Sequence, residues 1–180
     1  MSKENADKEQ KRSFKREAFS WIACIVVTIL LTEFILNFVI INANIPSGSM
    51  ENTIMTNDKL IALRTSYWFN DPKRGDIIIF KYPDDETEWF IKRVIALPGE
   101  TVLVKDGKVY INGSKKALSE PYIKEEPVED FGPYKVPKNG YFVMGDNRNN
   151  SNDAREWETH YVSRDEVLGK AWFRYYPSIK

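Results

Sequence analysis

The chain has 180 residues, which is enough for one domain of ordinary size and little more. Hydrophobic residues make up 42% of it, and 26 basic side chains balance 26 acidic ones, so the composition excludes a disordered chain and lacks the basic excess of nucleic-acid-binding proteins. Because the chain holds one cysteine, Cys24, and one histidine, His160, neither an intrachain disulfide nor a zinc site with four Cys and His ligands is possible.

A long apolar segment is the first predicted element. Residues 20–41 read SWIACIVVTILLTEFILNFVII and hold one charge, Glu33, whereas about 20 mainly apolar residues suffice to span a bilayer. Residues 1–19 include the basic run KRSFKRE, and positive segments tend to stay in the cytoplasm. We therefore predict a cytoplasmic N-terminus at 1–19, a transmembrane helix at 20–41 and an extracytoplasmic domain at 42–180.

Two other interpretations of the apolar segment stay open. A cleavable signal peptide has a similar basic start, but its cleavage site needs two small residues, and the INANIP that follows offers only Ala43. A buried core helix would be unusually apolar for so small a domain. In a membrane, Glu33 would cost roughly 2.5–3.5 kcal/mol, and Thr32 and Asn37 are its nearest polar neighbours. No role is assigned to Glu33.

After the apolar segment, the pattern changes to short strands. Runs of β-branched and aromatic residues are separated by Gly, Pro and Asn turns, among which Asp106-Gly107 is a strong hairpin signal. Residues 119–137 are rich in Pro and Glu and predict an exposed excursion. This spacing favours an all-β sandwich or barrel-like domain. The predicted strands are 76–82, 89–97, 101–104, 108–111, 141–144 and 167–176.

The first segment that could carry chemistry is IPSGSM at 45–50, where a glycine beside a serine lets the backbone turn and present a hydroxyl. A serine hydroxyl is a poor nucleophile and needs a base. His160 would supply a Ser-His arrangement, but it lies in the polar run WETHY, which is typical of an exposed surface. The alternative base is a neutral lysine, which must be desolvated because its ordinary pKa is about 10.4.

The predicted strand at 89–97 offers such a lysine. Alternation with period 2 places Lys92 between apolar neighbours on one face, where the amine could be stripped of water. An exposed lysine at a strand edge is the commoner case, and Lys81 meets the same apolar condition in the preceding strand. Spacing alone does not decide between these two lysines. Arg93 is excluded as a base because arginine does not deprotonate in proteins.

A third segment, 145–155, reads GDNRNNSNDAR and is too polar for a strand. A calcium loop is one interpretation, but Arg148 stands where an EF-hand pattern has an oxygen ligand. A solvated Asn-rich turn is the other.

Together, these segments resemble those of the bacterial type I signal peptidases. Four boxes of that family are matched in the family's order by PSGSM at 46–50, RGDIIIF at 74–80, FIKRVIALPGE at 90–100 and GDNRNNSNDAR at 145–155. The resemblance implies a mainly β, signal-peptidase/LexA-like catalytic domain preceded by one transmembrane helix. It also implies a membrane-bound serine endopeptidase that removes N-terminal signal peptides from exported preproteins, cutting after small residues at −1 and −3.

The resemblance further assigns roles to individual residues. Ser49 matches the nucleophile and Lys92 the general base, which decides between Lys92 and Lys81. The oxyanion hole would use the Ser49 amide and the Ser47 hydroxyl, and the reaction would pass through an acyl-enzyme without cofactor or metal. Three supporting residues also match: Ser151, which would orient the lysine, and a structural ion pair of Asp153 with Arg155.

The family's cellular setting is implied in the same way. We expect the chain to lie in the plasma membrane, in contact with the lipid bilayer, close to the export translocon, with signal peptides of secretory preproteins as partners and no nucleic acid. One departure from the family stands out: Asn52 occupies a position near the nucleophile where proline is usual, which predicts another loop shape.

Two rival functions are weighed against the peptidase. A self-cleaving repressor-like peptidase uses the same dyad in a related fold, but the apolar segment and the lack of a DNA-binding segment argue against it. A membrane-tethered β-domain that recruits partners without catalysis would tolerate substitution of Ser49 and Lys92.

Overall fold

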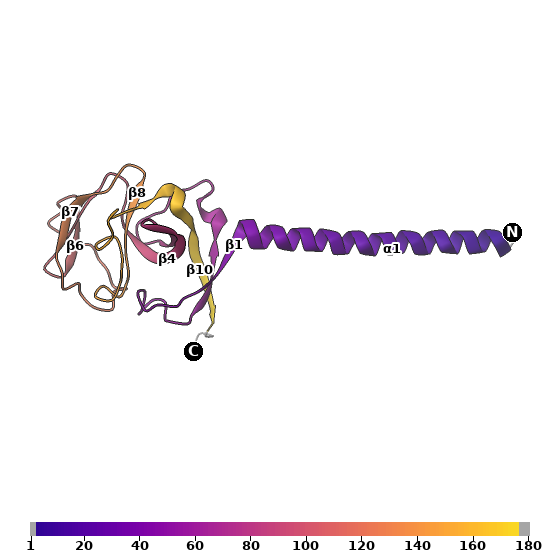
Figure 1. Ribbon diagram of the computed structural model, residues 1–180, viewed down its shortest axis with the longest axis horizontal. Coiled ribbons are helices and arrows are strands. Elements are labelled where there is room, and N and C mark those ends of the chain that lie inside the picture. The colour runs from indigo at the N-terminus through magenta and orange to yellow at the C-terminus, as the bar shows by residue number, and fades with distance from the viewer. Residues whose placement is uncertain (1–2, 177–180) are drawn as a thin grey trace. The chain divides into compact units, whose positions relative to one another are not determined.

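The computed structural model describes residues 3–176, with side chains from Phe14 onward, and divides the chain between Val39 and Ile40 (Figure 1). The N-terminal unit is the helix α1, Lys3–Phe34, followed by a π-helical turn at Ile35–Val39. Its segment Phe14–Val39 has a mean hydropathy of 2.4, and it is long and apolar enough to cross a membrane.

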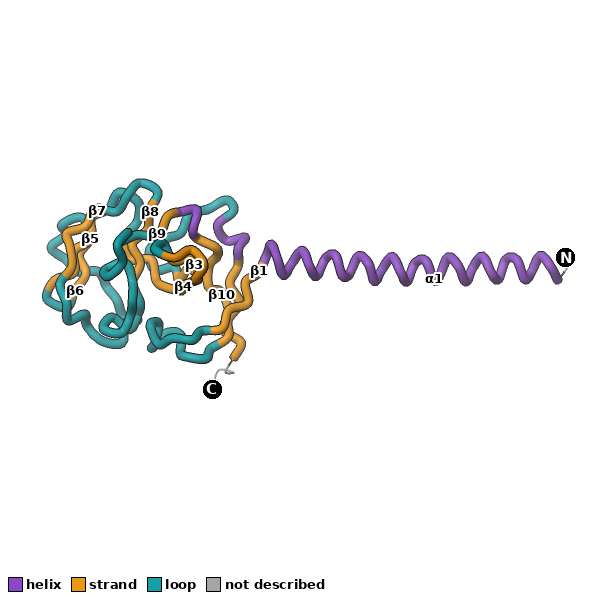
Figure 2. The backbone as a smooth tube through the Cα atoms, viewed as in Figure 1, coloured by secondary structure: helices purple, strands orange, loops and turns teal. Residues whose placement is uncertain are grey.

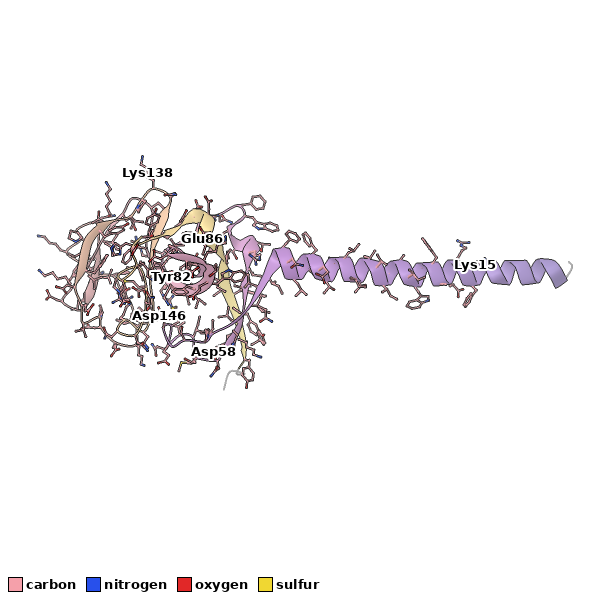
Figure 3. All side chains as sticks on the ribbon, viewed as in Figure 1. Lys15, Asp58, Tyr82, Glu86, Lys138 and Asp146 are labelled. Atoms are coloured by element: carbon pink, nitrogen blue, oxygen red, sulfur yellow. The ribbon has the colours of Figure 1, made fainter. Side chains whose placement is uncertain are left out.

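Within the described part of the helix, Glu33 has a polar neighbour and the basic side chains are exposed. Asn37 Nδ2 donates a hydrogen bond to Glu33 Oε2 at 3.0 Å, one helical turn away. Lys15, labelled in Figure 3, is exposed, as is Arg16, whereas the other basic side chains of the run, at 11 and 12, lie outside the described side chains.

The helical segment ends two residues before the predicted boundary. Ile40 and Ile41 belong to β1, Ile40–Asn44, which pairs antiparallel with β2, Lys59–Leu63. Ile41 is buried in a hydrophobic cluster of the second unit, so an apolar run continuous with the helix serves as strand and core.

The second unit contains a seven-stranded antiparallel sheet in the order β1-β2-β10-β3-β4-β8-β9 and a three-stranded sheet in the order β6-β5-β7 (Figure 2). The remaining strands of the larger sheet are β3, Ile77–Tyr82; β4, Asp85–Ala96; β8, Gly140–Met144; β9, Val162–Ser163; and β10, Val167–Tyr176. The smaller sheet consists of β5, Thr101–Lys105; β6, Lys108–Ile111; and β7, Phe131–Lys135. Short 3-10 helices lie at Arg64–Tyr67 and Arg164–Glu166.

Strand β3 separates two hydrophobic clusters. Its residues Ile78 and Phe80 face one cluster, whereas Ile79 faces the other, so the strand is buried on both sides and reads as a continuous apolar run. The second cluster, which we call the inner cluster, also contains Ile41 and Ile91. It therefore joins the first strand of the sheet to β4.

The predicted fold class, mainly β with one N-terminal apolar helix, is confirmed. Each predicted strand is present, two of them, β6 and β10, with the predicted bounds and the others with bounds shifted at one or both ends; four more, β1, β2, β7 and β9, were not predicted. The excursion predicted at 119–137 is only partly correct. Its first half is irregular, but β7 and the buried Val136 belong to the domain core, because Val102 of β5 pairs with Tyr134 of β7.

Candidate active site

Ser49 lies in a tight loop between β1 and β2. The base of this loop is closed by two backbone hydrogen bonds, from Ile45 N to Asp58 O at 3.0 Å and from Asn57 N to Ile45 O at 2.8 Å. The side chain of Met50 is completely buried in the inner cluster. Because the residue after Ser49 is anchored in the inner cluster, the backbone that carries the hydroxyl is fixed.

Lys92 reaches this hydroxyl from β4. Its Nζ lies 2.7 Å from Ser49 Oγ, and the two residues are only 4% and 6% exposed. Burial lowers the pKa of Lys92 from 10.5 to about 8; the charge of Asp153 raises this pKa, and that of Arg155 lowers it. Among the described residues, no carboxylate forms an ion pair with the amine, so its neutral form is far more populated near physiological pH than that of an ordinary exposed lysine.

The two other candidate bases lie in different surroundings. His160 Nδ1 lies 2.8 Å from Ala154 O, and its ring packs edge-on against Phe131 and Tyr134. It is half-buried among aromatic rings, and not exposed as the sequence predicted. Lys81 forms an ion pair with the exposed Glu86 at 3.3 Å. Of the three predicted bases, the structure therefore brings only Lys92 to the serine.

The predicted oxyanion group Ser47 stands beside the nucleophile, with its Oγ 3.4 Å from Ser49 Oγ. Asn147 holds two consecutive backbone carbonyls of this segment. Its backbone N–H donates to Ser49 O and its Nδ2 donates to Gly48 O, each at 3.0 Å. Sequence reasoning did not single out Asn147, although it lies in the third box. Its position explains why a polar loop distant in sequence belongs to the site.

Gly145 is required at the start of that loop by close packing. A Cβ at this position would collide with Ser49 O and with Ser151 Oγ. Ser151 is buried beside the nucleophile segment, but its Oγ has no hydrogen-bond partner within the described part of the chain, so it is not bonded to Lys92.

Asp153 and Arg155 form an ion pair behind the lysine. Arg155 donates from Nε and Nη2 to the two carboxylate oxygens of the fully buried Asp153, at 2.8 and 2.9 Å. The same carboxylate accepts a hydrogen bond from Gly145 N at 2.9 Å, and Arg155 Nη2 donates to Arg148 O at 2.6 Å. The pair therefore fixes the shape of the loop that carries Ser151.

A second buried ion pair, which the sequence did not predict, lies on the other side of β4. Arg93 donates to Asp146 through Nε at 2.8 Å and Nη2 at 2.6 Å, and its guanidinium lies 3.9 Å from the ring centroid of Tyr122. Both acidic residues of the third box are thus paired with arginines. Within the described residues, no group of three or more His, Cys, Asp or Glu could hold a metal ion.

The irregular segment before β7 packs against both the loop that carries Ser49 and the loop at 145–155. Glu120 accepts from the buried guanidinium of Arg148 at 2.6 Å, and Asn52 Nδ2 donates to Tyr122 O at 3.0 Å. Asn52 has a φ of +86°, which proline cannot adopt because its ring fixes φ near about −65°. The departure from the family at this position therefore has a conformational basis.

A cleft of about 660 Å³ leads to the dyad. One wall is β1 with the nucleophile loop, the other is the segment Glu88–Lys92 of β4, and Ile79 and the loop residues Asn150 and Asn152 complete the lining. Both walls are open edges: β1 pairs only with β2, and β8 joins β4 only from Arg93 onward. The cleft can therefore accept an extended peptide between two strands.

Comparison with known proteins identifies the family of this chain. The sequence profile of the family described as "Signal peptidase, peptidase S26" matches residues 18–176. A "Probable signal peptidase I-2" from Synechocystis sp. is 44% identical over 157 residues, which cover 84% of this chain and 70% of that protein. The "Signal peptidase I" of Bacillus licheniformis is 35% identical over 179 residues, 94% of each chain.

Among solved structures, the crystal structure of a signal peptidase I from Enterococcus faecalis V583 is 36% identical, with a TM-score of 0.49, and covers 56% of this chain and 97% of its own. The family profile spans most of the chain, and the curated relatives match over most of their own length. This chain belongs to the signal peptidase family, peptidase S26, and is a serine peptidase.

Proposed function

We propose that this chain removes N-terminal signal peptides from exported preproteins with Ser49 as nucleophile and Lys92 as general base. The observation that carries the proposal is the 2.7 Å contact between Lys92 Nζ and Ser49 Oγ in a buried setting that lowers the pKa of the amine. A neutral amine at this distance can accept the hydroxyl proton as the serine attacks a carbonyl.

The reaction then proceeds in two stages. Ser49 Oγ bonds to the scissile carbonyl carbon, and the resulting oxyanion receives hydrogen bonds from the Ser49 amide and the Ser47 hydroxyl. The ammonium of Lys92 returns the proton to the leaving amine, which gives an acyl-enzyme. Lys92 next removes a proton from water, which attacks the ester and releases the signal peptide with a free carboxylate. Asp153 and Arg155 fix the shape of the third-box loop near the base, and Ser151 lies in that loop without a hydrogen bond to Lys92.

The cleft supports an extended substrate. From β1 to β4 the sheet has four antiparallel steps, so these two strands run in the same direction and both lead toward the dyad. Because β1 follows the apolar helix directly in the chain, a peptide that comes from the membrane would run N to C along both strands. Side chains that face the inner cluster would meet Ile41, Ile79 and Ile91, a shallow apolar surface that suits small residues at −1 and −3.

The membrane setting follows from the helix. Residues 1–19 would lie in the cytoplasm, the span would cross the bilayer, and the domain from residue 42 onward would face outward, near the export translocon. Confinement of enzyme and substrate to one surface raises their effective concentration.

The test incubates detergent-solubilised chain with a preprotein and looks for the shortened product by mass. Ser49→Ala and Lys92→Ala should each lower the rate by at least about 10⁴-fold while the thermal unfolding transition persists. Undiminished cleavage by either folded variant would contradict the proposal, and a folded wild-type chain that does not cleave would favour a tethered β-domain without catalysis.

A further inference from the structure

The outer side of the cleft carries a charge that the reaction does not use. Among the residues that line the cleft, Glu88 and Lys92 are the two ionisable ones; Asn42, Asn44 and Asn152 are neutral. Glu88 is exposed, and no ion pair joins it to another described side chain. When Lys92 is in its neutral, reactive form, Glu88 is the one remaining charge among the residues that line the cleft.

This carboxylate lies on β4, four residues before Lys92. Lys92 Nζ lies 5.3 Å from the ring centroid of Phe90, so these two side chains share a face, and Ile91 points the other way into the inner cluster. Glu88 lies where the pairing of β4 with β3 shifts, so alternation does not fix its face, but it lines the cleft at the exposed end of the segment Glu88–Lys92. A peptide whose −1 and −3 side chains enter the inner cluster turns its −2 and −4 side chains to the opposite side.

The register follows from the dyad. Ser49 attacks the carbonyl of the −1 residue beside Lys92, which sets −1 level with Ile91. In a parallel pair each step back along the peptide matches one step back along β4, so −2 is level with Phe90 and −4 with Glu88. The carboxylate and the −4 side chain are then at the same level of the cleft, at its exposed end.

We propose that Glu88 is a specificity-determining residue that favours a basic over an acidic side chain at substrate position −4. The inference rests on the proposed function, because it needs a peptide to lie in this cleft. The carboxylate attracts an ammonium or guanidinium and repels a second carboxylate, and because both groups are solvated the effect is modest and sensitive to salt.

The test uses the detergent-solubilised full chain and internally quenched peptides that differ only at −4, with Lys, Gln or Glu. At low ionic strength, kcat/KM should be roughly three- to tenfold higher for the Lys peptide than for the Glu peptide. Glu88→Gln should bring this ratio close to 1, Glu88→Lys should invert it, and added salt should reduce it in the wild-type chain.

Glu86→Gln is the matched control, because Glu86 lies on the same strand, is paired with Lys81 and does not line the cleft (Figure 3). It should keep the wild-type ratio. A ratio that survives Glu88→Gln, or that falls equally in Glu86→Gln, would overturn the inference. If Ser49→Ala still cleaves the peptides, the proposed function itself fails; if cleavage needs Ser49 but ignores charge at −4, only the role of Glu88 fails.

Discussion

Two neighbouring residues of β4, Lys92 and Arg93, both bury basic groups, but only Arg93 has a carboxylate as partner. The guanidinium of Arg93 is neutralised by Asp146 through two hydrogen bonds and is covered by Tyr122. The amine of Lys92 contacts Ser49 Oγ, and no described carboxylate pairs with it. Burial of a paired cation keeps its charge, whereas burial of an unpaired one lowers its pKa. One strand thus provides a permanent structural charge and, one residue away, an amine that can act as a base.

The largest effect is expected from exchanging the chemistry of the two positions. Lys92→Arg should abolish cleavage, by about 10⁴-fold or more, because arginine cannot release its proton and its charge would have no partner. Arg93→Lys should keep cleavage within about tenfold, since a lysine can still pair with Asp146. The measurement is kcat/KM on one peptide for both variants; equal losses in both would remove the distinction between the two cations.

Removal of the partner of Arg93 should destabilise the folded chain, whereas removal of the amine of Lys92 should stabilise it. Asp146→Asn leaves the Arg93 guanidinium buried without a counter-charge and should lower the free energy of unfolding by about 3–5 kcal/mol. Urea denaturation followed by tryptophan fluorescence at pH 7 measures this. The paired control is Arg93→Met with Asp146→Leu, which should cost less than Asp146→Asn alone, because it leaves no isolated charge behind.

Lys92→Met should instead raise the denaturation midpoint. The pKa of Lys92 is about 8 in the folded chain and 10.5 ordinarily, so between these pH values the unfolded chain binds a proton that the folded chain lacks, and stability rises with pH. The penalty for the buried amine is therefore greatest below about pH 8. The gain from Lys92→Met should be largest there and should shrink toward pH 10.5; a loss of stability at pH 7 would contradict an unpaired, desolvated amine.

The smallest expected effect on stability comes from the Tyr122 ring that packs on the guanidinium of Arg93. Tyr122→Leu removes the ring 3.9 Å from the guanidinium, a contact worth about 0.5–2 kcal/mol, while the backbone carbonyl that accepts from Asn52 remains. Thermal unfolding should show a modest drop with little change in the pH dependence of cleavage. A shifted pH profile would mean that the two sides of β4 are coupled through more than the strand.

Sequence patterns predicted the strands that carry period-2 or continuous apolar runs, such as Ile77–Tyr82, because burial on two faces leaves a strong local signal. They missed Ile40–Asn44, because its apolar start is indistinguishable from the end of the preceding helix, and Phe131–Lys135, because proline and neighbouring acidic residues masked it. In both cases a partner strand distant in sequence decides the conformation.

The candidate site also contains residues that the sequence predicted and residues that only the structure revealed. Spacing could not separate Lys92 from Lys81, because both sit between apolar neighbours; the resemblance to the signal peptidases separated them, and the contact with Ser49 agrees. Asn147 and the pairing of Arg93 with Asp146 were not predicted. Their roles depend on contacts between segments 53 or more residues apart, about which local sequence holds no information.

The pH dependence of kcat/KM tests the central claim most directly, because it reports ionisations of the free enzyme. With a peptide that has no titrating group between pH 5 and 10, kcat/KM should rise with pH through a midpoint near 8, as the buried amine of Lys92 loses its proton. A rate that stays flat down to pH 5, or one that rises only near the ordinary lysine value of 10.5, would contradict a desolvated lysine base.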